Sequence, residues 1–185
     1  MNRLVGSFLL LAIAPAISFA QAAPAAAPAP SPSPVADALR DGLARYSKRM
    51  PAAADSMPAD KFSFKPTPDQ ITFAHLTLHI SESNYNFCSK IAAIAAPDVP
   101  KLTETDSKDK LVAALKTSFE FCSAALAKVD DSHLGESIPL FKGQNLSRAA
   151  AILILANSWG DHYSAQSMYL RLNSILPPTA QPAAK

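Results

Sequence analysis

Glycine, cysteine and clustered charge are all scarce in this 185-residue sequence. Only five glycines and two cysteines occur, and the chain has no glycine-rich phosphate loop, GxSxG elbow or CxxCH haem-attachment motif. These absences exclude a phosphate-binding loop, a nucleophilic serine on a GxSxG elbow and a haem attached through CxxCH. The 17 lysines and arginines are scattered among 15 acidic residues. Without a basic face or stripe, we expect no binding to nucleic acid. No internal repeat and no convincing strand pattern is present.

Residues 1–20 have the pattern of a secretory signal peptide. Arg3 is followed by the apolar stretch 4–17, and Ser18-Phe19-Ala20 provides the small residues that precede a cleavage site. An uncut membrane anchor is the alternative, but the stretch is short of the ~20 apolar residues that a span needs. No later stretch could cross a membrane without polar interruption. We therefore expect a periplasmic or secreted protein with no stable membrane insertion after cleavage.

The composition divides the rest of the chain into three parts. Residues 21–34 are almost only Ala, Pro, Ser and Gln, which is typical of a disordered linker. Residues 35–178 are long enough for one domain with a real core. Residues 179–185 are expected to form a flexible tail.

Alanine-rich segments and apolar residues at helical spacing predict four helices within residues 35–178. The predicted helices span 35–50, 67 or 69 to 95, 107–128 and 146–173. Proline is expected to end the first helix before Pro51 and the second before Pro97, and Ser107 is the expected N-cap of the third. A polar loop that contains His133 is expected over 129–145. The expected fold class is all-α, a four-helix bundle.

Three of the four histidines fall on two of the predicted helices. His75 and His79 lie four residues apart on one face of the second helix, which Glu82 shares, and His162 lies in the middle of the fourth. Facing helices of a bundle often build metal sites, and imidazole suits Zn, Ni, Fe or Cu. Alternatively, these histidines are only hydrogen-bonded in the core or partly exposed. Spacing alone leaves both interpretations open.

Three segments of the chain resemble the DinB-like superfamily of metalloenzymes, as found in exported bacterial members. They are MPADKFSFKPTP at 57–68, FAHLTLHI and NYNFC within 73–88, and the stretch from WGDHYSAQ to ILPP at 159–178. With the helix between them, they span most of the domain. The resemblance implies a four-helix bundle of the DinB-like type, whose topology is not a simple up-down-up-down arrangement.

The resemblance also implies a three-histidine metal site that leaves coordination positions open for water or substrate. His79 matches the ligand from the second helix, and His162 matches the second histidine of a His-x-x-x-His pair on the fourth. Ser158 stands where the pattern has the other histidine. Either His75 substitutes as the third ligand, or Glu82 or Asp161 supplies an oxygen, or the site is degenerate. The expected cofactor is a divalent ion, with Zn, Ni, Mn and Fe as candidates.

Members of the family with a known activity are thiol transferases, in which a metal-bound thiol attacks an electrophile. The resemblance therefore implies a metal-dependent transferase or hydrolase that acts on an unidentified small molecule. The alternative is a non-catalytic bundle with a degenerate metal site, acting as a scaffold or small-ligand binder. The sequence leaves the oligomeric state open, a homodimer included.

Cys88 and Cys122 are the only cysteines, and each lies late in a predicted helix. An even number of cysteines in an exported protein favours a disulfide, whereas two buried free thiols are the alternative. Antiparallel second and third helices would place the two cysteines at opposite ends of the bundle. If the link 97–106 crosses the bundle and makes these helices parallel, the cysteines come level.

Overall fold

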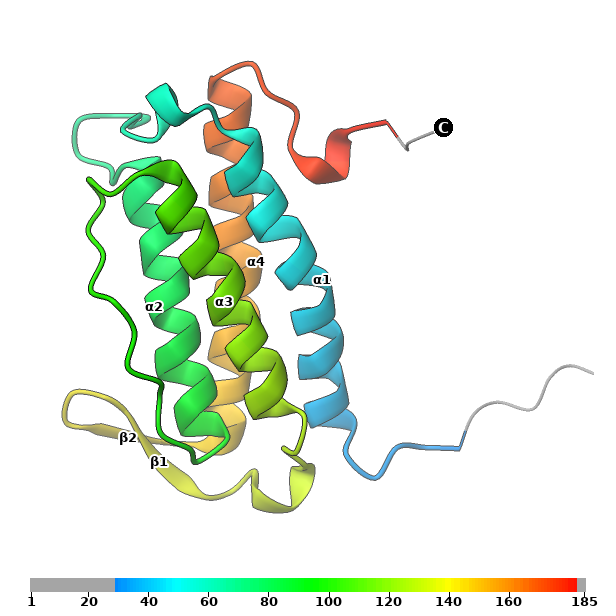
Figure 1. The fold of residues 1–185 in the computed structure, drawn as a ribbon. Helices are drawn as coiled ribbons and strands as arrows, with labels where there is room; N and C mark the ends of the chain where they lie inside the picture. The colour runs from blue at the N-terminus through cyan, green and yellow to red at the C-terminus, as the bar shows by residue number, and fades with distance from the viewer. Residues whose placement is uncertain (1–28, 183–185) are drawn as a thin grey trace, which may run out of the picture.

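The computed structural model describes residues 29–182 and contains four helices and one β-hairpin (Figure 1). The helices are α1 (Pro34–Ser56), α2 (Phe73–Ile91), α3 (Lys108–Leu126) and α4 (Arg148–Leu172), and the strands are β1 (Ser137–Phe141) and β2 (Gln144–Ser147). Short 3-10 turns cover Ala59–Lys61, Asp131–His133 and Pro178–Ala180. The expected signal peptide, most of the expected linker and the last residues of the expected tail lie outside the described residues.

The four helices form a bundle in which α2 and α3 run in the same direction, opposite to α1 and α4 (Figure 1). Residues 92–107, named here the crossover segment, return the chain along the bundle from the end of α2 to the start of α3. Helix α2 packs on α3 and α4, and α1 packs on the same two helices. None of the helices in residues 29–182 is long and apolar enough to span a membrane. The largest fully buried side chains include Leu39, Met50, Phe73, Ile80, Leu115, Leu155 and Trp159.

The expectation that α1 ends before Pro51 is wrong, because the helix continues to Ser56 with the proline inside it. A proline in a helix interior costs about 3 kcal/mol, since it removes a hydrogen bond and crowds the preceding turn. Pro51 is buried, however, and so are Met50, Ala53 and Ala54. Packing of this turn against the core offsets the cost of the proline.

Helix α2 is shorter than expected at both ends. It begins at Phe73 because Thr72 caps it, accepting a hydrogen bond from the His75 amide at 2.9 Å. At the other end, the amides of Ala93 and Ile94 bond back to the carbonyls of Lys90 and Ser89. With Ala93 at a φ of 54°, this is a Schellman motif, which stops the helix ahead of Pro97.

Residues 137–147 form a hairpin, whereas we expected a polar loop without strands. Ile138 and Leu140 alternate with exposed residues on β1 and are buried at 7% and 3% exposure. Gly143 has a φ of 76° in the turn between the strands, a conformation that glycine adopts without strain. The Lys90 ammonium donates to the Leu140 carbonyl at 2.8 Å. The hairpin thus covers the end of the bundle at which α2 finishes.

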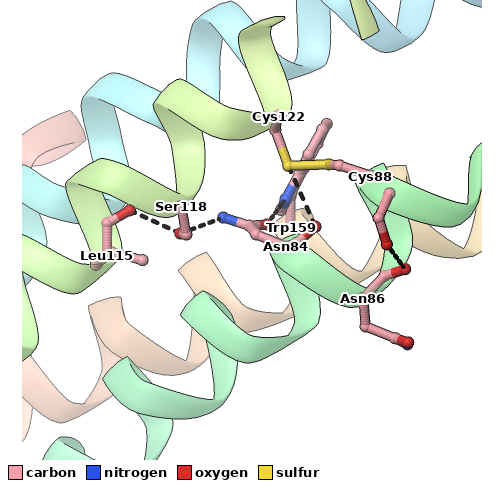
Figure 2. Close-up of a disulfide and its surroundings, with 8 residues drawn as sticks. Asn84, Asn86, Cys88, Leu115, Ser118, Cys122 and Trp159 are labelled. Carbon is pink, nitrogen blue, oxygen red and sulfur yellow. Dashed lines mark hydrogen bonds between the residues drawn. A yellow bond between two sulfur atoms is a disulfide. The ribbon is translucent and has the colours of Figure 1, made fainter. Parts of the chain in front are cut away.

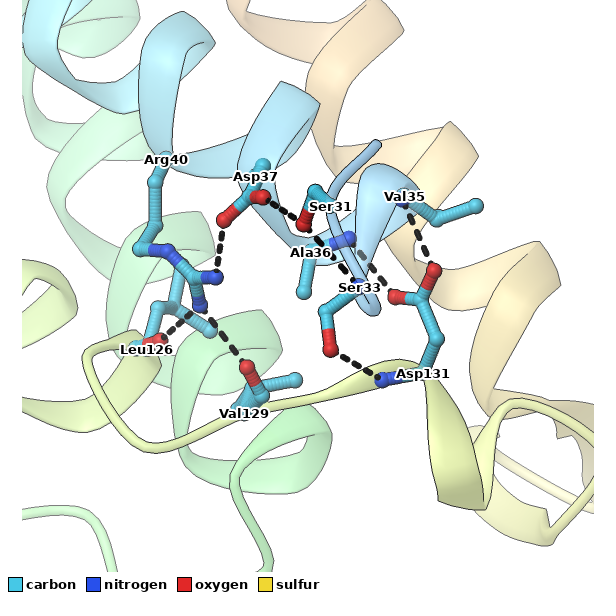
Figure 3. A network of polar contacts seen from close by, with 9 residues as sticks. All are labelled: Ser31, Ser33, Val35, Ala36, Asp37, Arg40, Leu126, Val129 and Asp131. Carbon is cyan, nitrogen blue, oxygen red and sulfur yellow. Dashed lines mark hydrogen bonds and ion pairs between the residues drawn. The ribbon is translucent and has the colours of Figure 1, made fainter. Parts of the chain in front are cut away.

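The start of α1 is joined to the loop after α3 by the polar contacts in Figure 3. The Asp131 carboxylate accepts hydrogen bonds from the amides of Val35 and Ala36, both at 2.9 Å. These amides belong to the first turn of α1, which has no partners for them within the helix. Arg40 donates to the carbonyls of Leu126 at 3.2 Å and Val129 at 2.7 Å. Segments about 90 residues apart in the chain are therefore fastened together here.

Cys88 of α2 and Cys122 of α3 form a disulfide in the structure, with 5.2 Å between their Cα atoms (Figure 2). Both cysteines are fully buried. They come level because the crossover segment makes α2 and α3 parallel, which is one of the two arrangements that the sequence left open. The described residues contain no free cysteine.

Candidate functional site

The structure brings His79 of α2 and His162 of α4 into contact. Their ring centroids lie 5.0 Å apart, and the ring planes meet nearly at a right angle. His79 is exposed and His162 is half-buried. The two imidazoles come from helices that run in opposite directions and pack on each other. This is the pair of residues that the resemblance to the DinB-like superfamily singles out.

Each histidine has a serine partner one turn away on its own helix. Ser158 Oγ lies 3.1 Å from His162 Nδ1, and Ser83 Oγ lies 3.4 Å from His79 Nε2. Sequence reasoning noted Ser158 only as a missing ligand and did not identify Ser83. The sequence signal for both contacts was the spacing of four residues between serine and histidine, because residues at this spacing are neighbours on one face of a helix.

His75 does not join this pair in the structure. Its ring Nδ1 lies 3.5 Å from Glu104 Oε2 of the crossover segment, and half of the side chain is exposed. Thr72 donates to the same carboxylate oxygen at 2.7 Å. His75 therefore helps to fasten the crossover segment to the start of α2.

The donor set at the histidine pair differs from the three-histidine centre that the resemblance implies. Two imidazoles and the Ser158 hydroxyl are present, and a neutral hydroxyl is a poor ligand for a divalent transition metal. Within residues 29–182, no group of three or more His, Cys, Asp and Glu side chains is placed to hold a metal ion. Glu82 and Asp161 are both exposed and do not complete a set of ligands. The residues present do not fit a three-ligand catalytic centre.

The electrostatic setting favours the neutral form of the His162 imidazole. Burial of its ring, followed by the neighbouring His79, lowers the pKa of His162 below the ordinary value of 6.5, and Asp161 acts in the opposite direction. A neutral histidine keeps a lone pair that can accept a hydrogen bond or bind a cation. His162 therefore offers a neutral imidazole at neutral pH.

The lowered pKa of His162 gives a pH dependence of folding that can be measured. Because the folded state disfavours the charged form, His162 contributes fully to stability above about pH 6.5. This contribution falls as the pH drops through the folded pKa, so acid destabilises the parent protein. We expect His162→Gln to lose less stability than the parent between pH 8 and pH 5, as measured by urea unfolding.

An NMR titration separates the two causes of the shift. In the variant His79→Gln, the pKa of His162 should rise but stay below its ordinary value, because burial is the larger cause. An unshifted His162 in the parent protein would contradict the prediction, and so would a pKa that His79→Gln leaves unchanged.

Helix α4 is held to α2 and α3 by a buried hydrogen-bond network (Figure 2). The side-chain oxygen of Asn84 accepts from Trp159 Nε1 at 2.8 Å, and its amide nitrogen donates to Ser118 Oγ at 3.0 Å. All three side chains are at most 1% exposed. Cys122 Sγ lies 3.4 Å from the Asn84 carbonyl oxygen, a contact and not a hydrogen bond, because a disulfide sulfur carries no proton.

The aromatic residues on α4 are part of the core. Trp159, Tyr163 and Tyr169 are 1%, 8% and 4% exposed. The Tyr169 hydroxyl donates to the Ile71 carbonyl at 2.7 Å, and the Tyr163 hydroxyl bonds to Thr179. These residues fix the position of α4 along the bundle axis, and so they also fix where His162 lies relative to His79.

Comparison with known proteins supports the assignment of this fold. A family model of the DinB superfamily matches residues 43–164, which is more than half of the chain. A DinB-like protein from Bacillus subtilis is similar in structure, with a TM-score of 0.63 and 20% identity, over 80% of this chain and 99% of that protein. A DinB-like protein from Bacillus cereus matches with a TM-score of 0.63 and 12% identity, over 77% and 95%. A search among curated proteins gives no match.

The family match covers His79, Ser158 and His162, and it confirms the resemblance identified from the sequence. At these identities, the two solved structures establish only the fold. The four-helix architecture, the contact between α2 and α4 and the matched range lead to one conclusion: the chain belongs to the DinB superfamily.

Proposed function

We propose that this chain is an exported DinB-superfamily bundle whose metal centre is degenerate, and that it acts as a small-ligand binder without metal-dependent catalysis. One observation carries the proposal: Ser158 takes the place of the third histidine and contacts His162. The remaining two imidazoles would hold a divalent ion only weakly, because structural and catalytic sites in proteins usually use at least three protein ligands.

Export is supported by the signal-peptide pattern and by the disulfide. A disulfide between Cys88 and Cys122 is typical of proteins in the periplasm or outside the cell, where thiols are oxidised. The pattern of residues 1–20 remains the main argument for this location.

The test compares metal binding by the parent protein and by Ser158→His. The proteins are purified without a histidine tag and titrated with Zn²⁺ or Ni²⁺ alone. Ser158→His supplies an imidazole one turn before His162, at the position where Ser158 Oγ lies 3.1 Å from His162 Nδ1. We expect this variant to bind the ion at least about 100-fold more tightly than the parent, since even outer partners of a ligand are worth 10–100-fold. Adding His79→Ala or His162→Ala to Ser158→His should remove the gain.

Two results would overturn the degenerate-site proposal. The first is about one tightly held ion per parent chain that is lost in both His79→Ala and His162→Ala, which would establish a working metal centre. The second is the absence of any gain in Ser158→His, which would show that the pair does not have the geometry of a metal site. Ser83→His serves as the matched control, because it places an imidazole beside His79 at a position where the family pattern has none.

A further inference from the structure

A cavity lies between α2, α3 and the crossover segment. It encloses about 760 Å³, within the ~300–1,000 Å³ that is typical of small-molecule sites. Its apolar wall includes Leu78 of α2, Ala114 of α3, and Val99 and Leu102 of the crossover segment. His79 and His162 do not line it, so this pocket is separate from the histidine pair.

The outer wall of the pocket is the crossover segment, and its middle part has no backbone hydrogen bonds to described residues. Among the described residues, no hydrogen bond involves the backbone of residues 95–102. Polar contacts tie the crossover segment to α2 only near its ends, by the amide of Ile94 on the Ser89 carbonyl and by Glu104 on Thr72 and His75. Loops of this length without regular structure are uncommon in compact domains and are usually functional or linkers. Apolar side chains such as Leu102, and not backbone hydrogen bonds, hold this wall over α2 and α3.

Positive charge exceeds negative charge in the lining of the pocket. Lys101 and Lys110 face a single carboxylate, Glu82. Lys110 is already paired with Asp106 at 3.0 Å, whereas no ion pair within residues 29–182 involves Lys101. Tyr85 adds a hydroxyl to the lining, and burial, followed by the charge of Glu120, raises its pKa. The phenol therefore stays protonated at neutral pH and is available as a donor.

We propose that this pocket binds a small amphipathic carboxylate, with its apolar body between Leu78, Ala114 and Leu102 and its carboxylate at Lys101. An apolar cavity with a few polar groups at one place orients a ligand that has one apolar and one charged end. The inference rests on the proposed role as a small-ligand binder and names the site and the class of ligand. The catalytic state of the histidine pair does not enter into it.

The test is a calorimetric titration of the full mature chain with decanoate. We expect saturable binding of one decanoate per chain, and weaker binding of decanol and decylamine, which have the same apolar body with a neutral or cationic head. Lys101→Gln should weaken decanoate binding by up to about fivefold, the range of an exposed ion pair, and leave decanol binding unchanged.

A second variant fills the cavity. Ala114 lines the pocket and is half-buried, so Ala114→Phe places a ring in the space of the ligand and should abolish binding. Ala124→Phe is the matched control, because Ala124 is exposed on the same helix and outside the lining. Thermal unfolding of both variants verifies that they fold. In the parent protein, NMR shifts on adding decanoate should concentrate at Leu78, Val99 and Leu102.

Several outcomes would overturn the proposal. These are no saturable binding of decanoate, equal affinity of Ala114→Phe and the parent, or tighter binding of decylamine than of decanoate. The last would show that Glu82, and not Lys101, selects the ligand. Such a failure differs from a failure of the degenerate-site proposal, which would appear only in the metal titration of the histidine pair.

Discussion

Reduction of the disulfide between Cys88 and Cys122 is expected to lower the free energy of unfolding by about 4 kcal/mol. The two cysteines are 34 residues apart, and closing a loop of this length restricts the unfolded chain by that amount in the chain-entropy model. The effect is large relative to the 5–15 kcal/mol that is typical of a domain. Urea unfolding with and without dithiothreitol measures the difference.

The double variant Cys88→Ala with Cys122→Ala provides the control for the reductant. It should unfold at lower urea than the oxidised parent, and dithiothreitol should not change its unfolding curve. The prediction fails if the parent unfolds at the same urea concentration in both conditions while a thiol assay shows that the bond is reduced.

Loss of the Asn84 side chain is expected to destabilise the bundle by about 3 kcal/mol. In Asn84→Ala, the buried Trp159 Nε1 loses its acceptor, and an unpaired buried donor costs about 1–3 kcal/mol. The missing side chain also leaves a cavity between α2, α3 and α4, which adds to the loss. Trp159 is the only tryptophan in the chain, so its fluorescence reports both the unfolding curve and any change around the ring.

The variant Asn86→Ala is the matched control on the same helix. Asn86 is half-buried, and its side chain makes no hydrogen bond to a described residue, so the change should be within about 0.5 kcal/mol. Equal effects of the two alanine substitutions would show that the network of Asn84, Ser118 and Trp159 does not carry the expected stability.

The sequence predicted the helices well where apolar periodicity was strong, and less well where tertiary contacts decide. Helices α3 and α4 lie within two residues of their predicted limits. Pro51 misled the prediction for α1, because local propensity does not show that the proline turn is buried. The end of α2 was also set by a contact pattern, the Schellman hydrogen bonds at Ala93, which occur here without the usual glycine.

The hairpin was missed because its signal is short and interrupted. Ile138 and Leu140 alternate with polar or exposed neighbours, and Gly143 marks the turn, but Pro139 stands between them in the strand. A proline inside a short run argues against a strand, because it has no backbone N–H to donate. In a two-stranded hairpin each strand is an edge strand, and an edge strand can accommodate a proline. The burial of β1 against the end of α2 could not be read from the sequence.

The candidate site was predicted in part. The resemblance identified His79 and His162, which the structure places in contact, and it identified Ser158 as the departure. The sequence could not show that His75 turns to Glu104, because that carboxylate lies on the crossover segment, nearly 30 residues further along the chain. The sequence also could not show that Asn84 bonds to side chains of α3 and α4, because a single buried asparagine leaves no periodic pattern.

The disulfide has one more consequence, because it closes a covalent ring of which the crossover segment is a part. Residues 88–122 form that ring, and the whole outer wall of the pocket lies on it. A protease that cuts the chain between residues 95 and 102 would therefore leave one molecule, with its two fragments joined through sulfur. The fragments would migrate together on a non-reducing gel and separate only after reduction, so a molecule cut in this segment would keep both halves of its bundle.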